Sequence, residues 1–194
     1  MPEIIDHTLH IADHSEALPR LAQPAAVHIW SVPTEYRASG YYVSLQLGGQ
    51  PVELPACDYR DATKIARLEL AADPDVAAAA EREAREQSDR ELIAERRYRA
   101  EIGGVTVSGM PIDTGRDSQG LITGAALQAI IDPEYALQWK TSGGFVELAG
   151  QQILGVASAV RAHVQDCFNR EAALLDAVAD GSFGAQMLDE GWPA

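Results

Sequence analysis

The chain has 194 residues, of which 46% are hydrophobic, and a formal net charge of −14 from 29 acidic and 15 basic residues. This hydrophobic content is typical of a folded protein and too high for a disordered one. A surface so negative is repelled by phosphate, so we expect no binding of nucleic acid.

No apolar run approaches the ~20 residues that cross a bilayer, so we expect no membrane insertion. The N-terminus lacks the basic start and apolar core of a signal peptide, so the chain is expected to stay in the cytoplasm unless another component carries it out.

Cysteine and histidine spacing gives little support for a metal site. Cys57 and Cys167 lie far apart with no CxxC pattern, so each is expected to be a buried free thiol. His7, His10 and His14 would share one face of a helix, as metal ligands must. The N-terminus is expected to be extended instead, where His7 and His10 point to opposite faces. We therefore expect neither a metal nor a cofactor.

The first 72 residues form the expected β-rich module. Alternation over residues 41–47 predicts a strand that places Tyr41, Val43, Leu45 and Leu47 on one face. The glycines that follow predict a turn, and residues 51–55 predict a returning strand. Because a lone hairpin is only marginally stable in water, a third strand at residues 27–32 is also expected.

Residues 73–101 are expected to form a linker helix between two domains. Pro74 suits a first helical turn, Asp73 is the expected N-cap, and neither glycine nor proline follows until after Glu101. Opposite charges recur at i,i+4, in the pairs Glu81/Arg85, Arg82/Glu86, Glu86/Arg90 and Glu95/Arg99. A helix that is polar on every side usually bridges two domains or lies on a partner.

The C-terminal domain, residues 102–194, is expected to combine helices with two β-hairpins, which makes the whole chain α+β. The first hairpin is expected at residues 105–107 and 110–112, with Pro111 confining its second strand to a sheet edge. A helix over about 116–131 should follow, capped by Asp113 or Thr114. Its apolar stripe is predicted from the spacing of Leu121, Ala125, Leu127/Gln128 and Ile131.

A second hairpin is expected at residues 137–141 and 145–148, and a long helix at about 150–179. The helix carries apolar residues at spacings of three and four, interrupted only by Glu171: Ile153, Val156, Val160, Val164, Cys167, Leu174 and Val178. We expect this stripe to close an intramolecular bundle rather than a trimeric coil. The last residues should form a loose tail whose large side chains are free to pack.

No residue pattern predicts catalysis, so we expect no enzyme activity. Ser118, His163 and Asp113 lack the spacing of a nucleophile signature, and the glycine pairs lack that of a phosphate loop. A fibre-tip hydrolase would need paired carboxylates in a cleft, and Asp132 with Glu134 is the only pair that fits that alternative.

Aromatic residues mark the candidate interaction sites. Trp139 either fills a gap between the last two helices or anchors an interface, with Lys140 beside it in solvent. Trp30 and Tyr41 are the corresponding candidates in the N-terminal module.

Several segments between Tyr98 and Val178 carry a family resemblance. They are Gly103–Thr114, Ser118–Gln119, Gly124–Ala126, Trp139–Thr141, Gly144–Leu148, and Val160–Val164 with Glu171. Together they resemble an uncharacterised domain family that recurs at the C-terminal end of small proteins in the tail-fibre region of tailed bacteriophages and prophages.

The resemblance implies a tail-fibre accessory protein, located in the virion tail and in the host cytoplasm during assembly. We favour a structural adaptor that docks by its N-terminal module onto a tail-fibre or baseplate protein, with its C-terminal domain presented outward or self-associating. The alternatives are a fibre-assembly chaperone, and a fibre-tip protein that binds or degrades host surface polysaccharide. A helical module that binds a basic host protein is a further possibility.

Overall fold

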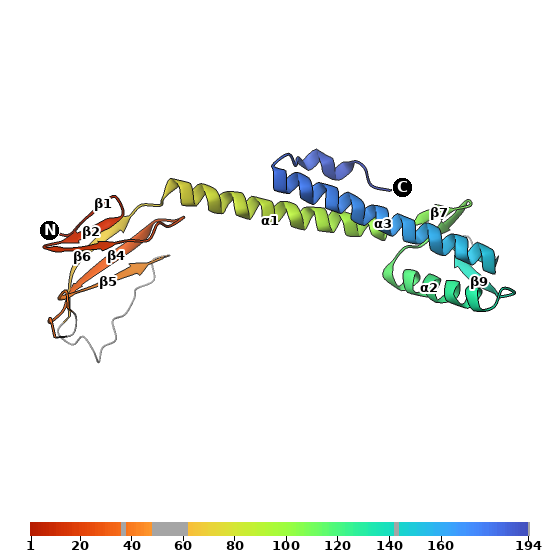
Figure 1. Ribbon diagram of the computed structural model, residues 1–194, viewed down its shortest axis with the longest axis horizontal. Coiled ribbons are helices and arrows are strands. Elements are labelled where there is room, and N and C mark those ends of the chain that lie inside the picture. The colour runs from red at the N-terminus through yellow and green to blue at the C-terminus, as the bar shows by residue number, and fades with distance from the viewer. Residues whose placement is uncertain (36–37, 48–61, 142–143, 194) are drawn as a thin grey trace. The chain divides into compact units, whose positions relative to one another are not determined.

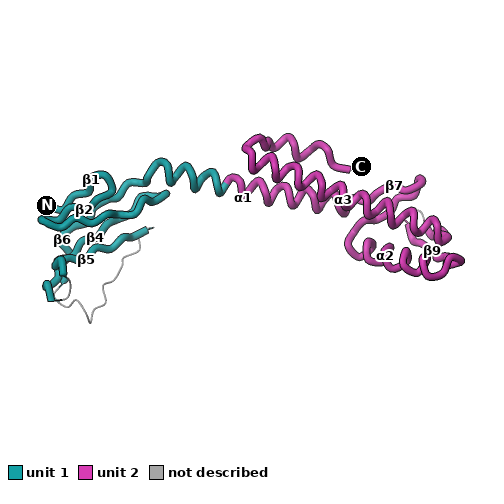
Figure 2. The backbone as a smooth tube through the Cα atoms, in the orientation of Figure 1, with its two compact units in different colours: residues 1–84 teal, residues 85–194 magenta. Residues whose placement is uncertain are grey.

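The computed structural model describes residues 1–35, 38–47, 62–141 and 144–193, and the fold is α+β as predicted. The chain divides into two compact units, Met1–Ala84 and Arg85–Ala194 (Figure 2). Each unit is described by itself below. The predicted returning strand at 51–55 and Cys57 lie outside the described residues.

The described part of unit 1 contains two small antiparallel sheets, followed by the first part of a helix (Figure 1). The first is a meander of β1 (Glu3–Ile5), β2 (Thr8–Ile11) and β3 (His14–Ala17). The second has the order β5-β4-β6, formed by β4 (Ala25–Ser31), β5 (Tyr41–Gln46) and β6 (Thr63–Leu70). The third strand expected at residues 27–32 is thus the centre of this sheet.

The core of unit 1 lies between these two sheets. Its buried side chains come from β2, β4, β6 and the loop after β3: Leu9, Ile11, Leu18, Ala25, Val27, Ile29 and Leu70. Tyr41, Val43 and Leu45 pack against it from β5, as the alternation predicts. Leu47 does not, because β5 ends at Gln46 and the Leu47 side chain is 59% exposed.

The three N-terminal histidines do not converge on one point. His7 lies in the turn between β1 and β2, His10 accepts or donates a hydrogen bond with Ser15 Oγ (2.9 Å), and His14 lies 3.7 Å from a Glu16 carboxylate oxygen. Among the described residues, no group of three metal-binding side chains occurs.

Asp73 connects the end of unit 1's sheets to the first helix, α1 (Pro74–Glu101). Its Oδ1 accepts the backbone N–H of Asp75 (3.0 Å) and of Val76 (3.2 Å), which confirms the predicted N-cap. Its Oδ2 pairs with Arg20 (3.2 Å), and the carboxylate is buried. Hydrogen bonds from the backbone N–H groups of Val76 and Asp75, together with the charge of Arg20, hold the Asp73 pKa below its usual value, although burial opposes this shift.

This lowered pKa gives a pH-dependent prediction for Asp73→Asn, which keeps a capping oxygen but removes the charge. A depressed folded-state pKa stabilises the protein above the unfolded-state pKa, and this stabilisation is lost as pH falls through the folded value. We therefore expect Asp73→Asn to melt below wild type at neutral pH and the difference to shrink by about pH 3. Melting curves at both pH values test this. The exposed Asp75→Asn is the control and should change melting little at neutral pH.

The helix α1 begins and ends as predicted, and two of its predicted ion pairs form. Arg90 pairs with Glu86 (3.2 Å) and Arg99 pairs with Glu95. The boundary between the units falls within α1, after Ala84, inside the segment predicted to link the two domains. Its last turns belong to unit 2 because Ile93 is fully buried there, against Leu174 and Val178.

In its described residues, unit 2 contains two hairpins, the end of α1, two further α-helices and a short 3-10 helix; all but the last lie close to their predicted positions. Its elements after α1 are β7 (Val105–Val107), β8 (Met110–Ile112), α2 (Arg116–Ile131), β9 (Ala136–Thr141), β10 (Gly144–Ala149), α3 (Gly150–Asp180) and the 3-10 helix η1 (Ala185–Asp189). All seven residues of the predicted α3 stripe are buried inside the unit. The stripe therefore closes an intramolecular bundle, as expected. In the described residues, no helix is long and apolar enough to cross a membrane.

Glu171 interrupts the α3 stripe because it is paired rather than packed. The Arg97 guanidinium of α1 donates to Glu171 Oε2 (3.2 Å) and to Glu101 Oε2. All three side chains are largely buried, with exposed fractions of 13% for Arg97, 5% for Glu101 and 16% for Glu171. The cluster therefore links α1 to α3 by ion pairs at the position where the apolar stripe is interrupted.

The C-terminal tail is more ordered than predicted. Phe183, Met187, Leu188 and Trp192 pack against the end of the α1–α3 pair. The Trp192 indole N–H donates to the Leu188 carbonyl (2.8 Å), and Arg170 donates to the Met187 carbonyl (2.9 Å). These bonds fold the tail back as η1, so the expectation of a loose tail is wrong although its side chains pack as expected.

Two predictions about α2 are corrected. Its N-cap is Gly115, without a side-chain cap, rather than Asp113 or Thr114. Its buried residues are Ile122 and Ala129, whereas Leu121, Leu127 and Ile131 of the predicted stripe are 66%, 60% and 69% exposed. The helix meets α3 through its small alanines and Ile122, and hydrophobicity alone could not select that side because the opposite side is apolar too.

Thr114 closes the junction between α1, the first hairpin and α2, and is fully buried. Its hydroxyl accepts the Gly104 N–H (2.9 Å) and donates to the Glu101 carbonyl (2.6 Å). Its own carbonyl accepts from Gln119 Nε2 (2.8 Å). The residue is therefore a structural connector rather than a helix cap.

We expect Thr114→Val to lower the free energy of unfolding by about 1–3 kcal/mol, because the buried Gly104 N–H and Glu101 carbonyl would each lose a partner. The exposed strand residue Thr106 provides a matched Thr→Val control, expected to stay within about 0.5 kcal/mol of wild type. Urea unfolding followed by circular dichroism measures both. Equal effects in the two variants would contradict the role given to Thr114.

Candidate interaction surface

Trp139 lies on β9, where it joins two core clusters of unit 2. Its half-buried ring packs against the cluster around Ile112 and Val160 and against the cluster around Leu148 and Ile153. The sequence left open whether Trp139 fills the interior or anchors an interface, and the structure gives it packing inside the unit. Its remaining surface lines a shallow groove of about 530 Å³ along α2 and β9.

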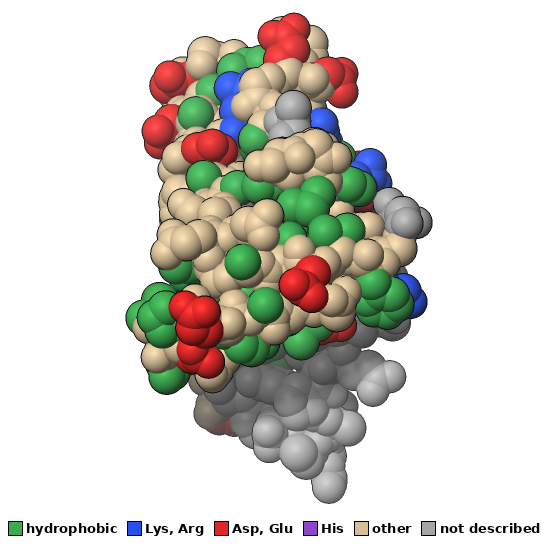
Figure 3. All heavy atoms as spheres, turned by 90° about the vertical axis from the view of Figure 1, so that its right-hand side faces the viewer, with side chains coloured by type: hydrophobic (Ala, Val, Ile, Leu, Met, Phe, Trp, Pro, Cys, Tyr) green, Lys and Arg blue, Asp and Glu red, His purple; other side chains and the backbone are tan. Residues whose placement is uncertain are grey.

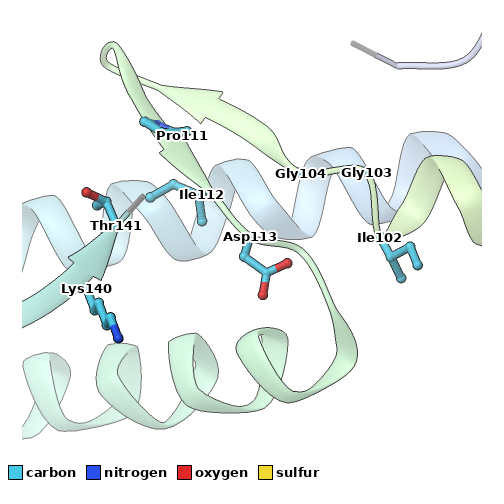
Figure 4. Close-up of a pocket in the computed structure, with 8 residues that line it drawn as sticks. All are labelled: Ile102, Gly103, Gly104, Pro111, Ile112, Asp113, Lys140 and Thr141. Atoms are coloured by element: carbon cyan, nitrogen blue, oxygen red, sulfur yellow. The ribbon is translucent and has the colours of Figure 1, made fainter. Parts of the chain in front are cut away.

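The next residue, Lys140, lines a separate pocket of about 280 Å³ beside the Gly103–Gly104 loop. Figure 4 shows Lys140, from β9, and Asp113, just after β8, both directed toward α2. Hydrogen bonds from Ser118 and from the Gly115 N–H lower the Asp113 pKa. The pocket therefore presents one carboxylate and one ammonium group.

The glycine loop of this pocket does not form a phosphate cradle. The Gly103 N–H donates to the Ala100 carbonyl (3.1 Å), and the Gly104 N–H donates to Thr114. Both backbone donors are thus used within the chain, whereas a phosphate loop must direct its N–H groups at the ligand. Gly104 has a φ of +89°, so its role is to turn the chain from α1 into β7.

The β9–β10 hairpin presents an exposed aromatic residue next to Lys140. In its antiparallel register Lys140 lies opposite Phe145 and Trp139 lies opposite Val146. Phe145 is 69% exposed, whereas Trp139 is directed into the unit. Lys140 and Phe145 therefore share the side of the hairpin opposite Trp139.

The other two candidate residues, Trp30 and Tyr41, belong to unit 1. Tyr41 packs against the core of that unit from β5. Trp30 is half-buried on β4, and Lys64 Nζ lies 5.7 Å from the centre of its ring. Both residues take part in the sheet of unit 1, and neither is more than half-exposed.

The residues that could have suggested catalysis are engaged in structural contacts, and the Ser118 hydroxyl donates to Asp113 Oδ2 (2.5 Å). His163 is buried, its Nε2 lying 3.1 Å from the Ala100 carbonyl and 3.9 Å from Cys167 Sγ. Burial raises the pKa of the Cys167 thiol, which keeps it protonated and unreactive at neutral pH. Asp132 Oδ1 accepts the N–H of Glu134 (3.0 Å) in the turn after α2, so that pair makes a local turn.

One exposed apolar surface of unit 2 was missed from the sequence. It consists of the outer side of α2, with Leu121, Leu127, Ile130 and Ile131 all at least 60% exposed. Figure 3 views unit 2 from the side where α2 ends, and shows hydrophobic side chains interspersed with polar surface and few basic ones. The signal was present as a run without charge: Ser118–Ile131 contains no acidic, basic or histidine residue. An uncharged helix is typical of one buried on all sides.

A family described as Domain of unknown function (DUF4376) matches residues 83–190. The matched region coincides closely with unit 2, from the middle of α1 to the C-terminal tail. Neither a curated protein nor a solved structure matches the chain.

Proposed function

We propose, from the premise that this chain belongs to the DUF4376 family, that it is a non-enzymatic structural component of a bacteriophage tail fibre or tail tip. In this role it acts as an adaptor. Unit 1 docks onto a fibre or baseplate protein, and unit 2 carries the second interaction surface.

The observation that carries this proposal is the motif resemblance between Tyr98 and Val178. That stretch lies wholly within the 83–190 family region. The motif residues also hold structural positions in unit 2, since Gly104 turns the chain, Thr114 closes the junction and Trp139 joins two clusters. The resemblance therefore rests on residues that specify the fold of this unit.

The organisation of the chain supports an adaptor with two binding ends. Each unit has its own hydrophobic core, so each can present a surface independently. The first part of α1 is exposed over residues 78–85, which suits a spacer that makes few contacts of its own. The charge of −14 keeps such a component soluble before assembly.

The proposal is tested by deleting the gene and fractionating the infected or induced lysate. For an adaptor, we expect the fibre protein to remain soluble while purified particles lose fibres and adsorb poorly to the host. Supplying the full chain should restore both. Insoluble fibre protein in the deletion would instead identify an assembly chaperone, and unchanged fibres and adsorption would contradict any tail role.

A further inference from the structure

The outer side of α2 has no partner within the described chain, although it carries no charged residue from Gly120 to Ile131. At about 100° per residue, Gly120, Gly124, Leu127 and Ile131 fall within one narrow sector, opposite the buried Ile122 and Ala129. Leu127 and Ile131 are 60% and 69% exposed. This sector, the α2 ridge, would normally carry the polar residues of a surface helix.

The two glycines of the α2 ridge are not required by close packing inside unit 2, although both line the groove beside Trp139. No atom of another described segment lies within 4 Å of a Cβ placed on Gly120 or Gly124. A glycine inside a helix costs about 1 kcal/mol relative to alanine, so both positions weaken α2 without an internal benefit. Glycines in an exposed helix face allow a second helix to approach closely.

The α2 ridge is complementary to itself. Positions 120 and 131, and likewise 124 and 127, are equally spaced about a midpoint between Ala125 and Ala126. A second α2 running antiparallel through that midpoint would place each Leu127 against Gly124 of the other copy, and each Ile131 against Gly120. Large side chains would then enter the spaces that the glycines leave, which is what a two-fold interface requires.

Charge also favours a second copy as the occupant. Two chains of net charge −14 repel each other, so they can meet only where neither presents a charge. The uncharged run Ser118–Ile131 meets that condition, whereas α1 carries acidic residues along its length and α3 carries them from Asp166 onward. A basic partner would be recognised by acidic groups, and the α2 ridge contains none.

We propose that the α2 ridge is a homodimer interface in which two α2 helices pack antiparallel about a two-fold axis that crosses the ridge between Gly124 and Leu127. A helix of 16 residues is about 24 Å long, so a single helix pair is smaller than a standard interface of roughly 800 Å² per partner. The dimer should therefore dissociate on dilution. The inference concerns the purified chain and does not depend on the tail function.

The test is sedimentation equilibrium of the full chain over a wide concentration range. Wild type should move reversibly from the monomer mass of 20.8 kDa to twice that mass. Gly124→Leu fills the space needed by Leu127 of the other copy, and Leu127→Glu brings like charge into the interface. Each should weaken dimerisation by at least about tenfold. Leu92→Glu, at a 46% exposed apolar position of α1, is the matched control and should dimerise like wild type.

Thermal melting distinguishes weakened dimerisation of the variants from misfolding. Both α2 substitutions are at exposed positions, and Gly124→Leu also improves helix propensity, so monomer stability should be equal or higher. A wild-type chain that stays monomeric at every concentration would overturn the proposal. So would a trimer, or variants that dimerise as well as wild type.

Cysteine crosslinking tests the antiparallel register directly. In a Cys57→Ser background, with the buried Cys167 left in place, chains carrying Gly124→Cys are mixed with chains carrying Leu127→Cys. The mixture should crosslink faster than either variant alone. If Gly124→Cys alone crosslinks faster than the mixture, the helices are parallel and the proposed interface is wrong.

Discussion

Arg97→Met is expected to lower the free energy of unfolding of unit 2 by about 3–5 kcal/mol, because it leaves two largely buried carboxylates without their cation. Glu101 and Glu171 both accept from the Arg97 guanidinium, and they come from different helices. Methionine keeps much of the apolar stem but loses the guanidinium, whose carbon also lies 4.6 Å from the centre of the Phe168 ring, so the loss reports mainly on the charged group. Urea unfolding followed by the helical circular-dichroism signal measures the change.

Arg99→Met is the matched control for this prediction. Arg99 also lies on α1 and pairs with the glutamate four residues before it, but its side chain is 68% exposed and that of Glu95 is 58% exposed. Exposed pairs of this kind contribute about 0.3–0.5 kcal/mol. Similar losses for Arg97→Met and Arg99→Met would show that the buried cluster does not hold α1 to α3.

Leu174→Ala is expected to cost about 2–5 kcal/mol, since it removes a fully buried side chain from the cluster that joins α1, α3 and the C-terminal tail. The residue contacts a region built from three segments, so the space left behind cannot be filled by one neighbour alone. Chemical unfolding gives the free energy. Proteolysis of the tail after η1 should also accelerate, because Trp192 and Met187 pack on the same cluster.

The control for Leu174→Ala is the same substitution at Leu121, which is 66% exposed on α2. Its effect on the isolated monomer should stay within about 0.5 kcal/mol. A loss at Leu121 as large as that at Leu174 would mean that α2 is covered within the monomer, contrary to the structure.

The periodic elements of unit 2 could be predicted from sequence because local pattern and tertiary packing agree there. The α3 stripe repeats at helical spacing and faces the interior without exception, and Asp132–Pro133 ends α2 where expected. Glu171 interrupts the pattern because it pairs with Arg97 on another helix, and the spacing of residues in the sequence cannot reveal such a partner.

Predictions failed where local signals were weak or pointed in two directions. The β1–β3 meander turns at Asp6, His7 and Ala12, which adopt positive φ although they are not glycine, so no turn signature marked it. The buried side of α2 could not be chosen because both sides are apolar. Distant groups decided the role of Thr114, which bonds to Gly104 and Glu101 rather than capping its own helix.

The central claim, that this chain is a structural adaptor of a phage tail, is tested most directly by a mass-spectrometric inventory of purified particles with copy numbers. We expect the chain to be present in a fixed ratio to the fibre or baseplate protein that it joins. An even copy number would agree with pairing through α2. Particles that carry fibres but lack this chain would contradict the claim.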